Sequence, residues 1–131
     1  MTAGTPIQPG DCHCHGGDVR GFLQPRILLA LSKAPAYGYD LLEGLRHEPA
    51  EREPDTGNLY RMLRCMEQDG LVSSGWDTSG AGPARRVYQI TEQGSRLLDE
   101  WAVVLGRTRQ WLDAFLEDYE ILTQRRSYER V

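Results

Sequence analysis

One segment of the chain, residues 55–70, carries a set of hydrogen-bonding side chains at the spacing of a single helix face. Its members are Gly57, Asn58, Arg61, Arg64 and Gln68. Arginine and asparagine can each donate paired hydrogen bonds to base edges in the major groove of DNA. The same pattern also suits the solvated face of an ordinary amphipathic helix, so the flanking sequence has to separate the two interpretations.

The ends of this segment predict a helix. Asp55 follows Pro54 and can cap the first turn, and Gly70 suits the left-handed residue that ends the last turn. The expected buried face consists of Leu59, Met62, Leu63 and Met66. The candidate DNA contacts on this helix are Thr56, Asn58, Tyr60, Arg61 and Arg64, where Tyr60 flanks the polar face with a hydroxyl that can reach a phosphate.

Two shorter helices are expected before this one. Residues 22–31 place Pro25 in an opening turn and carry the stripe Leu23, Ile27, Leu28 and Leu31. Residues 38–46 direct Leu41, Leu42 and Leu45 inward, with Asp40 near the positive end of the helix. A polar linker, 48–54, is broken twice by proline. Three helices in a row, with the donors on the third, are typical of a helix-turn-helix.

A β-hairpin is expected after Gly70. Residues 71–76 and 85–90 have strand composition, and the Gly-rich stretch 77–84 between them has the composition of a loop. Arg85 and Arg86 open the returning strand, where they could neutralise phosphates. A hairpin with no such role remains the alternative.

A long helix over residues 92–124, capped by Thr91, carries an apolar heptad stripe. Its expected dimer-interface residues are Leu98, Trp101, Leu105, Leu112, Phe115 and Tyr119. So much apolar surface favours a second subunit, with packing against the first helix of the same chain as the alternative. Trp101 and Trp111 could flank a planar apolar effector, although packing alone would also explain them. Residues 125–131 are expected to be a frayed tail.

The N-terminal residues 1–20 are expected to be a flexible tail. It contains Cys12, His13, Cys14 and His15, which are weak candidates for metal binding because a closed zinc site usually draws ligands from two places in a chain. The alternative is a solvated tail that binds metal adventitiously. With three cysteines and no secretory signal, reduced thiols are expected. No cofactor is expected.

Charge is distributed unevenly along the 131 residues, whose formal net charge is −4. Residues 56–91 hold four arginines and three acidic residues, whereas residues 92–120 hold three arginines and seven acidic residues. One part could therefore approach phosphate while the other would be repelled. No apolar run is long enough to span a bilayer, so we expect a cytoplasmic protein, and no catalytic set suggests an enzyme.

The residues resemble the PadR family of transcriptional regulators over about residues 22–119. The resemblance rests on Tyr37-Gly38-Tyr39-Asp40-Leu41, on Leu59-Tyr60 with Leu63, Arg64, Glu67, Gly70 and Leu71, and on residues 85–94. It implies a homodimeric winged helix-turn-helix protein, usually a repressor, with Tyr39, Tyr60 and the wing arginines near phosphate. Asn58 and Arg61 stand where the family often has threonine and proline, so the operator sequence does not follow from the resemblance.

Together these features predict a mainly α fold with a small β-hairpin wing and a long C-terminal dimerisation helix. The expected division is a tail (1–20), a winged helix-turn-helix domain (21–91), a dimerisation helix (92–124) and a frayed end (125–131). The expected function is a DNA-binding repressor that acts as a homodimer on an operator duplex and is released by an unknown small molecule. The alternative is a winged-helix module that binds proteins.

Overall fold

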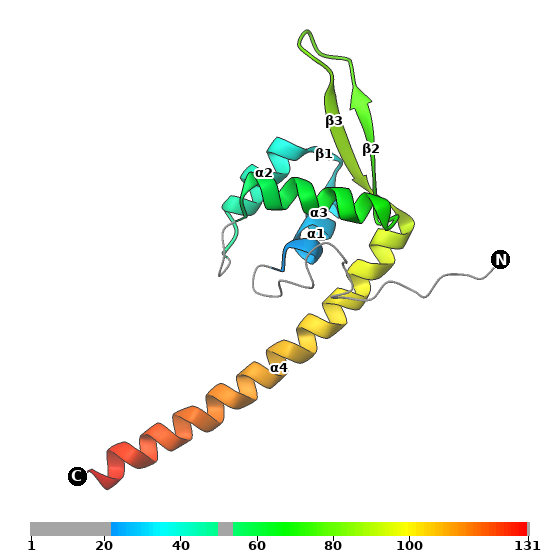
Figure 1. The fold of residues 1–131 in the computed structure, drawn as a ribbon. Helices are drawn as coiled ribbons and strands as arrows, with labels where there is room; N and C mark the ends of the chain where they lie inside the picture. Colours follow the sequence, from blue (N-terminus) through cyan, green and yellow to red (C-terminus); the bar gives the residue numbers. More distant parts are fainter. Residues whose placement is uncertain (1–21, 50–53, 131) are drawn as a thin grey trace, which may run out of the picture. The chain divides into compact units, whose positions relative to one another are not determined.

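The computed structural model describes residues 22–49 and 54–130 (Figure 1). Its elements are α1 (Leu23–Lys33), β1 (Ala36–Tyr37), α2 (Gly38–Arg46), α3 (Thr56–Gln68), β2 (Val72–Asp77), β3 (Arg85–Ile90) and α4 (Glu92–Glu129). The fold is mostly helical with a small antiparallel sheet, as the sequence predicted. The chain divides into two compact units, Met1–Glu100 and Trp101–Val131.

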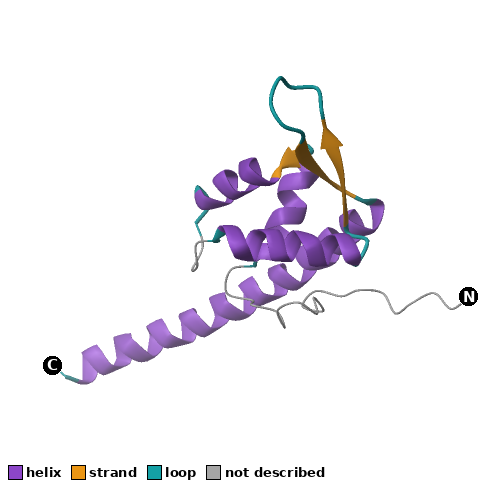
Figure 2. Ribbon diagram, turned by 45° about the horizontal axis from the view of Figure 1, so that its top comes forward, coloured by secondary structure: helices purple, strands orange, loops and turns teal. Residues whose placement is uncertain are grey.

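The core of the first unit forms where α1, α2 and α3 pack together beneath the hairpin of β2 and β3 (Figure 2). Its fully buried members include Ile27, Leu28, Leu45, Leu59, Leu63, Met66 and Leu71. The predicted inward face of α1 needs one correction, since Leu23 is only half-buried while Gln24 and Pro25 are buried. Positions 24, 27, 28 and 31 share one helical face, and this face includes Gln24 rather than Leu23.

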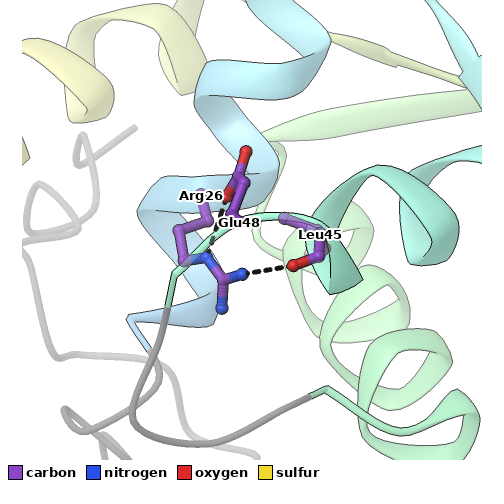
Figure 3. A network of polar contacts seen from close by, with 3 residues as sticks. All are labelled: Arg26, Leu45 and Glu48. Carbon is purple, nitrogen blue, oxygen red and sulfur yellow. Dashed lines mark hydrogen bonds and ion pairs between the residues drawn. The ribbon is translucent and has the colours of Figure 1, made fainter.

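An arginine joins α1 to the C-terminal end of α2 (Figure 3). The Arg26 Nη2 donates to the carbonyl oxygen of Leu45 at 2.7 Å, and Nε donates to Glu48 Oε2 at 3.1 Å. Carbonyls in the last turn of a helix have no partner within the helix, and they carry the negative end of its dipole. Arg26 supplies both a donor and a positive charge at this point.

Both predicted ends of α3 are confirmed. The Asp55 side chain accepts a hydrogen bond from the Asn58 backbone N–H at 2.8 Å, and Gly70 adopts φ 77° in the turn that follows the helix. A positive φ is accessible to glycine without steric cost. The predicted inward residues are also confirmed, because Leu59, Met62, Leu63 and Met66 are all buried.

The sheet has the strand order β1-β3-β2, with both pairs antiparallel. The hairpin pairs Val72 with Ile90 at its base and Asp77 with Arg85 next to the loop. Strand β2 lies one residue later than predicted, and the sequence did not predict β1. The two residues of β1 are too few for a periodic signal, and their strand conformation depends on pairing with Val87 and Tyr88.

Thr91 joins the sheet to α4, as its predicted capping role requires. Its hydroxyl donates to the Gly70 carbonyl oxygen at 2.6 Å and accepts from the Gly94 N–H at 3.0 Å. Gly94 lies so near that a Cβ there would stand 2.1 Å from the Leu71 carbonyl oxygen. The predicted end of the last helix was wrong, because α4 continues through residues 125–129 to Glu129. The polar side chains of these residues remain compatible with a solvated helix.

Candidate nucleic-acid interface

The outward face of α3 presents the side chains that the sequence singled out. Thr56, Arg61 and Arg64 are exposed, and Tyr60 is 40% exposed. The buried leucines and methionines of α3 occupy the opposite side, so these side chains can reach a ligand without disturbing the core. The two arginines lie one helical turn apart, a spacing that suits neighbouring base steps in a major groove.

Asn58, which the sequence predicted as a DNA contact, is hydrogen-bonded to the capping residue Asp55. Its side-chain amide donates to Asp55 Oδ2 at 3.0 Å, while its backbone N–H donates to Oδ1 of the same carboxylate. Residue 58 is the third residue of α3, where a side chain can reach back to the capping residue. The amide donor therefore helps to cap the helix, and reading a base with it requires breaking this bond.

A surface pocket of about 340 Å³ opens beside α3, between the N-terminal end of α2 and β3. It is lined by Tyr37, Gly38, Tyr39, Asp40, Tyr60, Arg85, Arg86 and Tyr88. Phenol and guanidinium donors thus gather in one hollow, a chemistry that suits phosphate oxygens. Burial raises the pKa of the Tyr88 phenol, whose side chain forms the inner part of this pocket.

Arg85 lies next to the loop of the wing, beside a group of polar side chains that joins β1 to β2. Its guanidinium carbon lies 5.3 Å from the centre of the Tyr37 ring. The Tyr37 hydroxyl donates to Asp77 Oδ2, while the Ser79 N–H and hydroxyl donate to Oδ1 at 2.9 and 2.6 Å. The hydrogen bonds from Ser79, and then the one from Tyr37, lower the pKa of Asp77 to about 2. Hydrogen bonding to Asp77 in turn raises the pKa of Tyr37.

Arg86 has a separate set of partners. Its Nε donates to Ser74 Oγ at 2.9 Å, and the Ser74 hydroxyl donates to Glu67 Oε1 at 2.5 Å. The Arg86 Nη2 lies 3.7 Å from Glu67 Oε2, and the guanidinium carbon lies 5.5 Å from the centre of the Trp76 ring. The wing is thereby tied to α3 through Glu67. Sequence reasoning missed five site residues, because strand pairing and the packing of α3 bring them together from separate elements: Trp76, Ser74, Glu67, Tyr37 and Asp77.

The second unit, Trp101–Val131, exposes a large apolar surface on α4. Exposed there are Trp111, Leu112, Phe115, Leu116, Tyr119, Ile121 and Leu122. The rings of Trp111 and Phe115 stack with centroids 6.0 Å apart. Of the other residues expected at a dimer interface, Leu98 and Leu105 are half-buried and Trp101 is 6% exposed. The expected pocket between Trp101 and Trp111 therefore joins one buried and one exposed indole, and it stays a prediction.

The candidate metal ligands Cys12, His13, Cys14 and His15 lie outside the described residues. Within residues 22–49 and 54–130, no three His, Cys, Asp or Glu side chains form a group that could hold a metal ion. The expectation of reduced thiols is wrong for Cys65, which lies on the buried side of α3 and is disulfide-bonded. None of the described helices combines the length and apolar content needed to cross a membrane.

The structure has three helices, and a β-hairpin follows the third of them. Arginines lie on both the third helix and the hairpin. This arrangement defines a winged helix-turn-helix protein. A sequence model of the transcriptional regulator PadR-like family matches residues 27–100. The chain belongs to this family, whose members are transcriptional regulators and not enzymes. The resemblance seen in the sequence is thereby confirmed.

Solved structures with the same fold are similar to this chain over most of its length. A potential transcriptional factor of unknown function is 31% identical, with a TM-score of 0.70 over 79% of this chain and 91% of that protein. A PadR-like transcriptional regulator from Bacillus cereus is 28% identical, with a TM-score of 0.64 over 72% of this chain and 90% of the other. A comparison with curated proteins finds no match.

The PadR protein of Bacillus subtilis has been solved in complex with operator DNA. It is 21% identical to this chain, with a TM-score of 0.56, and the match covers 62% of this chain and 46% of that protein. At this level of identity the likeness concerns the fold.

Proposed function

We propose that this chain is a cytoplasmic DNA-binding repressor that acts as a homodimer and is released from its operator by a small molecule. The observation that carries the proposal is the alignment of donors along one side of the first unit. Arg61 and Arg64 are exposed on α3, and the pocket lined by Tyr39, Tyr60 and the wing arginines opens beside them. Family membership and the operator complex of the Bacillus subtilis protein support the same function.

The proposed division of labour follows from where each donor lies. Arg61 and Arg64 project from the recognition helix and read base edges, whereas Tyr39, Tyr60, Arg85 and Arg86 hold phosphates. Thr56 and Asn58, in the first turn of α3, make the remaining contacts, with Asn58 contributing what its bonds to Asp55 leave available.

Dimerisation is proposed through the apolar stripe of α4. The exposed side chains Leu112, Phe115 and Tyr119 fall on one stripe and have few contacts in the single chain. Burying them against a second copy removes this apolar surface from water. A dimer also presents two copies of α3 to two half-sites of one duplex, which raises affinity and sets their spacing.

Release is proposed through a planar apolar effector that binds near Trp101 and Trp111. Titration with aromatic compounds, followed by tryptophan fluorescence in a Trp76→Phe background, tests this part. A spectral change that saturates, together with loss of DNA binding, is the expected result. An unchanged spectrum with every compound contradicts it.

The experiment that tests the central proposal is footprinting of the full chain on the DNA upstream of its own gene, followed by binding measurements at several salt concentrations. We expect a protected, roughly symmetric site and an affinity that falls steeply as salt rises. Arg64→Ala should cost about 1–3 kcal/mol of binding free energy and relax preference at one base pair. Arg96→Ala, which removes an exposed arginine elsewhere, is the matched control and should change neither property. Salt-independent or undetectable duplex binding would instead favour a protein-binding module.

A further inference from the structure

Trp76 is a large apolar side chain left in solvent on the wing. It lies on β2 and is 65% exposed, although most residues that flank it are small or polar. A single exposed apolar side chain is common on protein surfaces and needs no explanation by itself. What distinguishes this indole is the arginine held against its face.

Arg86 is the cross-strand partner of Trp76, and its guanidinium lies over the indole ring at 5.5 Å. Ser74, two residues before Trp76 on the same face of β2, accepts from Arg86 Nε at 2.9 Å. Glu67 of α3 accepts from the Ser74 hydroxyl and lies 3.7 Å from Arg86 Nη2. The guanidinium is therefore held on three sides, by a ring, a hydroxyl and a carboxylate.

Such an arrangement fixes an arginine before its ligand arrives. A long side chain loses rotamer freedom when it binds, and contacts already made in the unbound protein reduce this cost. A guanidinium held over an indole ring keeps N–H groups at its edge, where planar donors match the oxygens of a phosphate. The indole also offers its own N–H and an apolar face that can pack on a deoxyribose.

We propose that Trp76 contacts the sugar–phosphate backbone of duplex DNA and acts with Arg86 as one unit, which Ser74 and Glu67 position. This inference rests on the proposed DNA-binding function and adds a contact residue to it. Two carboxylates, Glu67 and Asp77, lie beside the two arginines of the wing, so net positive charge contributes little there. The contact therefore depends on where the N–H donors of Arg86 and Trp76 lie. Because it involves the backbone and no base, it should form with DNA of any sequence.

The test measures binding of the full chain to a mixed-sequence duplex and to the footprinted site. We expect Trp76→Ala to weaken binding to both duplexes roughly tenfold. Without the ring, Arg86 is no longer held in place, and the expected loss corresponds to about one charge-assisted hydrogen bond to phosphate. Trp76→Phe keeps a ring beneath Arg86 and should retain most of the affinity. Tyr128→Ala removes another exposed aromatic, at the end of α4, and is the matched control that should bind normally.

A double-mutant cycle tests whether the two residues act together. If they act as one unit, Trp76→Ala combined with Arg86→Ala loses less binding free energy than the sum of the losses of the two single variants. Fluorescence supplies a second measurement, since Trp76 emission, taken as the difference between the native chain and Trp76→Phe, should shift when duplex is added.

The outcomes separate this inference from the function on which it rests. Normal binding by Trp76→Ala, additive losses in the cycle, or a duplex-insensitive Trp76 signal would overturn the inference and leave the DNA-binding function intact. A native chain that binds neither duplex would overturn both.

Discussion

Tyr60 of α3 lies against Gly38 of α2 so closely that a Cβ on Gly38 would stand 2.7 Å from the Tyr60 Cε1 and hydroxyl oxygen. The absence of a side chain at residue 38 therefore allows the phenol to lie beside the N-terminal end of α2. Both residues line the pocket that also receives Arg85 and Arg86. The glycine at residue 38 of α2 thus determines where Tyr60 of α3, a proposed phosphate contact, can lie.

Gly38→Ala should accordingly lower the affinity for DNA while leaving the stability of the fold nearly unchanged. The atoms nearest to the added methyl group belong to the far end of the half-exposed Tyr60 side chain, which can rotate away, so the free energy of unfolding should change by less than about 1 kcal/mol. DNA affinity should fall severalfold because the hydroxyl loses its place. Thermal unfolding and duplex binding measure the two effects. In a Tyr60→Ala background the same substitution should have no further effect on affinity, and an additional loss there would contradict the explanation.

Gly94→Ala should behave in the opposite way. A Cβ on Gly94 would lie 2.1 Å from the backbone carbonyl oxygen of Leu71, which has no rotamer to change, so the start of α4 and the turn before β2 must move apart. We expect a loss on the order of 3 kcal/mol in the free energy of unfolding, measured by denaturant titration. Gly106→Ala is the matched control: no described atom near that position opposes a methyl group, so helix propensity should stabilise the chain by about 0.5–1 kcal/mol.

The lowered pKa of Asp77 predicts that the stability of the wing depends on pH. Its pKa is lowered from 3.8 to about 2, so the stabilising effect of the charged form is complete above pH 3.8 and is lost as the pH falls through about 2. The difference in melting temperature between the native chain and Asp77→Asn should therefore be constant near neutral pH and shrink toward zero between these values. A difference that persists at the acidic end would show that ionisation of Asp77 is not its source.

Arg26 should contribute more to stability than its salt-bridge partner. Its side chain is 13% exposed and donates to the Leu45 carbonyl, whereas the Glu48 side chain is 41% exposed (Figure 3). Arg26→Leu removes both hydrogen bonds and should cost about 1–3 kcal/mol in the free energy of unfolding. Glu48→Gln leaves the bond to Leu45 in place and should cost well under 1 kcal/mol. Equal losses in denaturant titrations would mean that the ion pair, and not the carbonyl contact, joins the two helices.

The proposed dimer can be tested on the exposed stripe of α4. Leu112→Asp places a charge on the surface that is to be buried, so sedimentation should detect monomers, and operator affinity should fall roughly a hundredfold as the second half-site contact is lost. Gln110→Asp introduces the same charge on the same helix at an exposed position off the stripe and should leave the assembly unchanged. A dimeric Leu112→Asp protein would place the interface elsewhere.

Local signals predicted most of this fold correctly. Asp55 and Gly70 mark the ends of α3 through chemistry that acts within a few residues, and Thr91 caps α4 in the same way. Strand β1 escaped prediction because Ala36 and Tyr37 become a strand only by pairing with residues far along the chain. The partners of Arg86 were hidden for a related reason: Ser74 and Trp76 face it only in the observed register, and Glu67 comes from another element. Local signals also did not show that the Asn58 amide is bonded to Asp55.

The two faces of α3 have a consequence for how such a chain can change over time. Leu59, Leu63 and Met66 hold the helix in the core, while Arg61 and Arg64 stand exposed on the other side. Substitutions on the exposed side usually alter the free energy of folding by less than about 0.5 kcal/mol. With the base-reading role that we propose for Arg61 and Arg64, a lineage that carries this chain can exchange one DNA target for another by single steps, each of which leaves a folded protein. Duplicated copies in one genome can diverge in target while keeping the same scaffold.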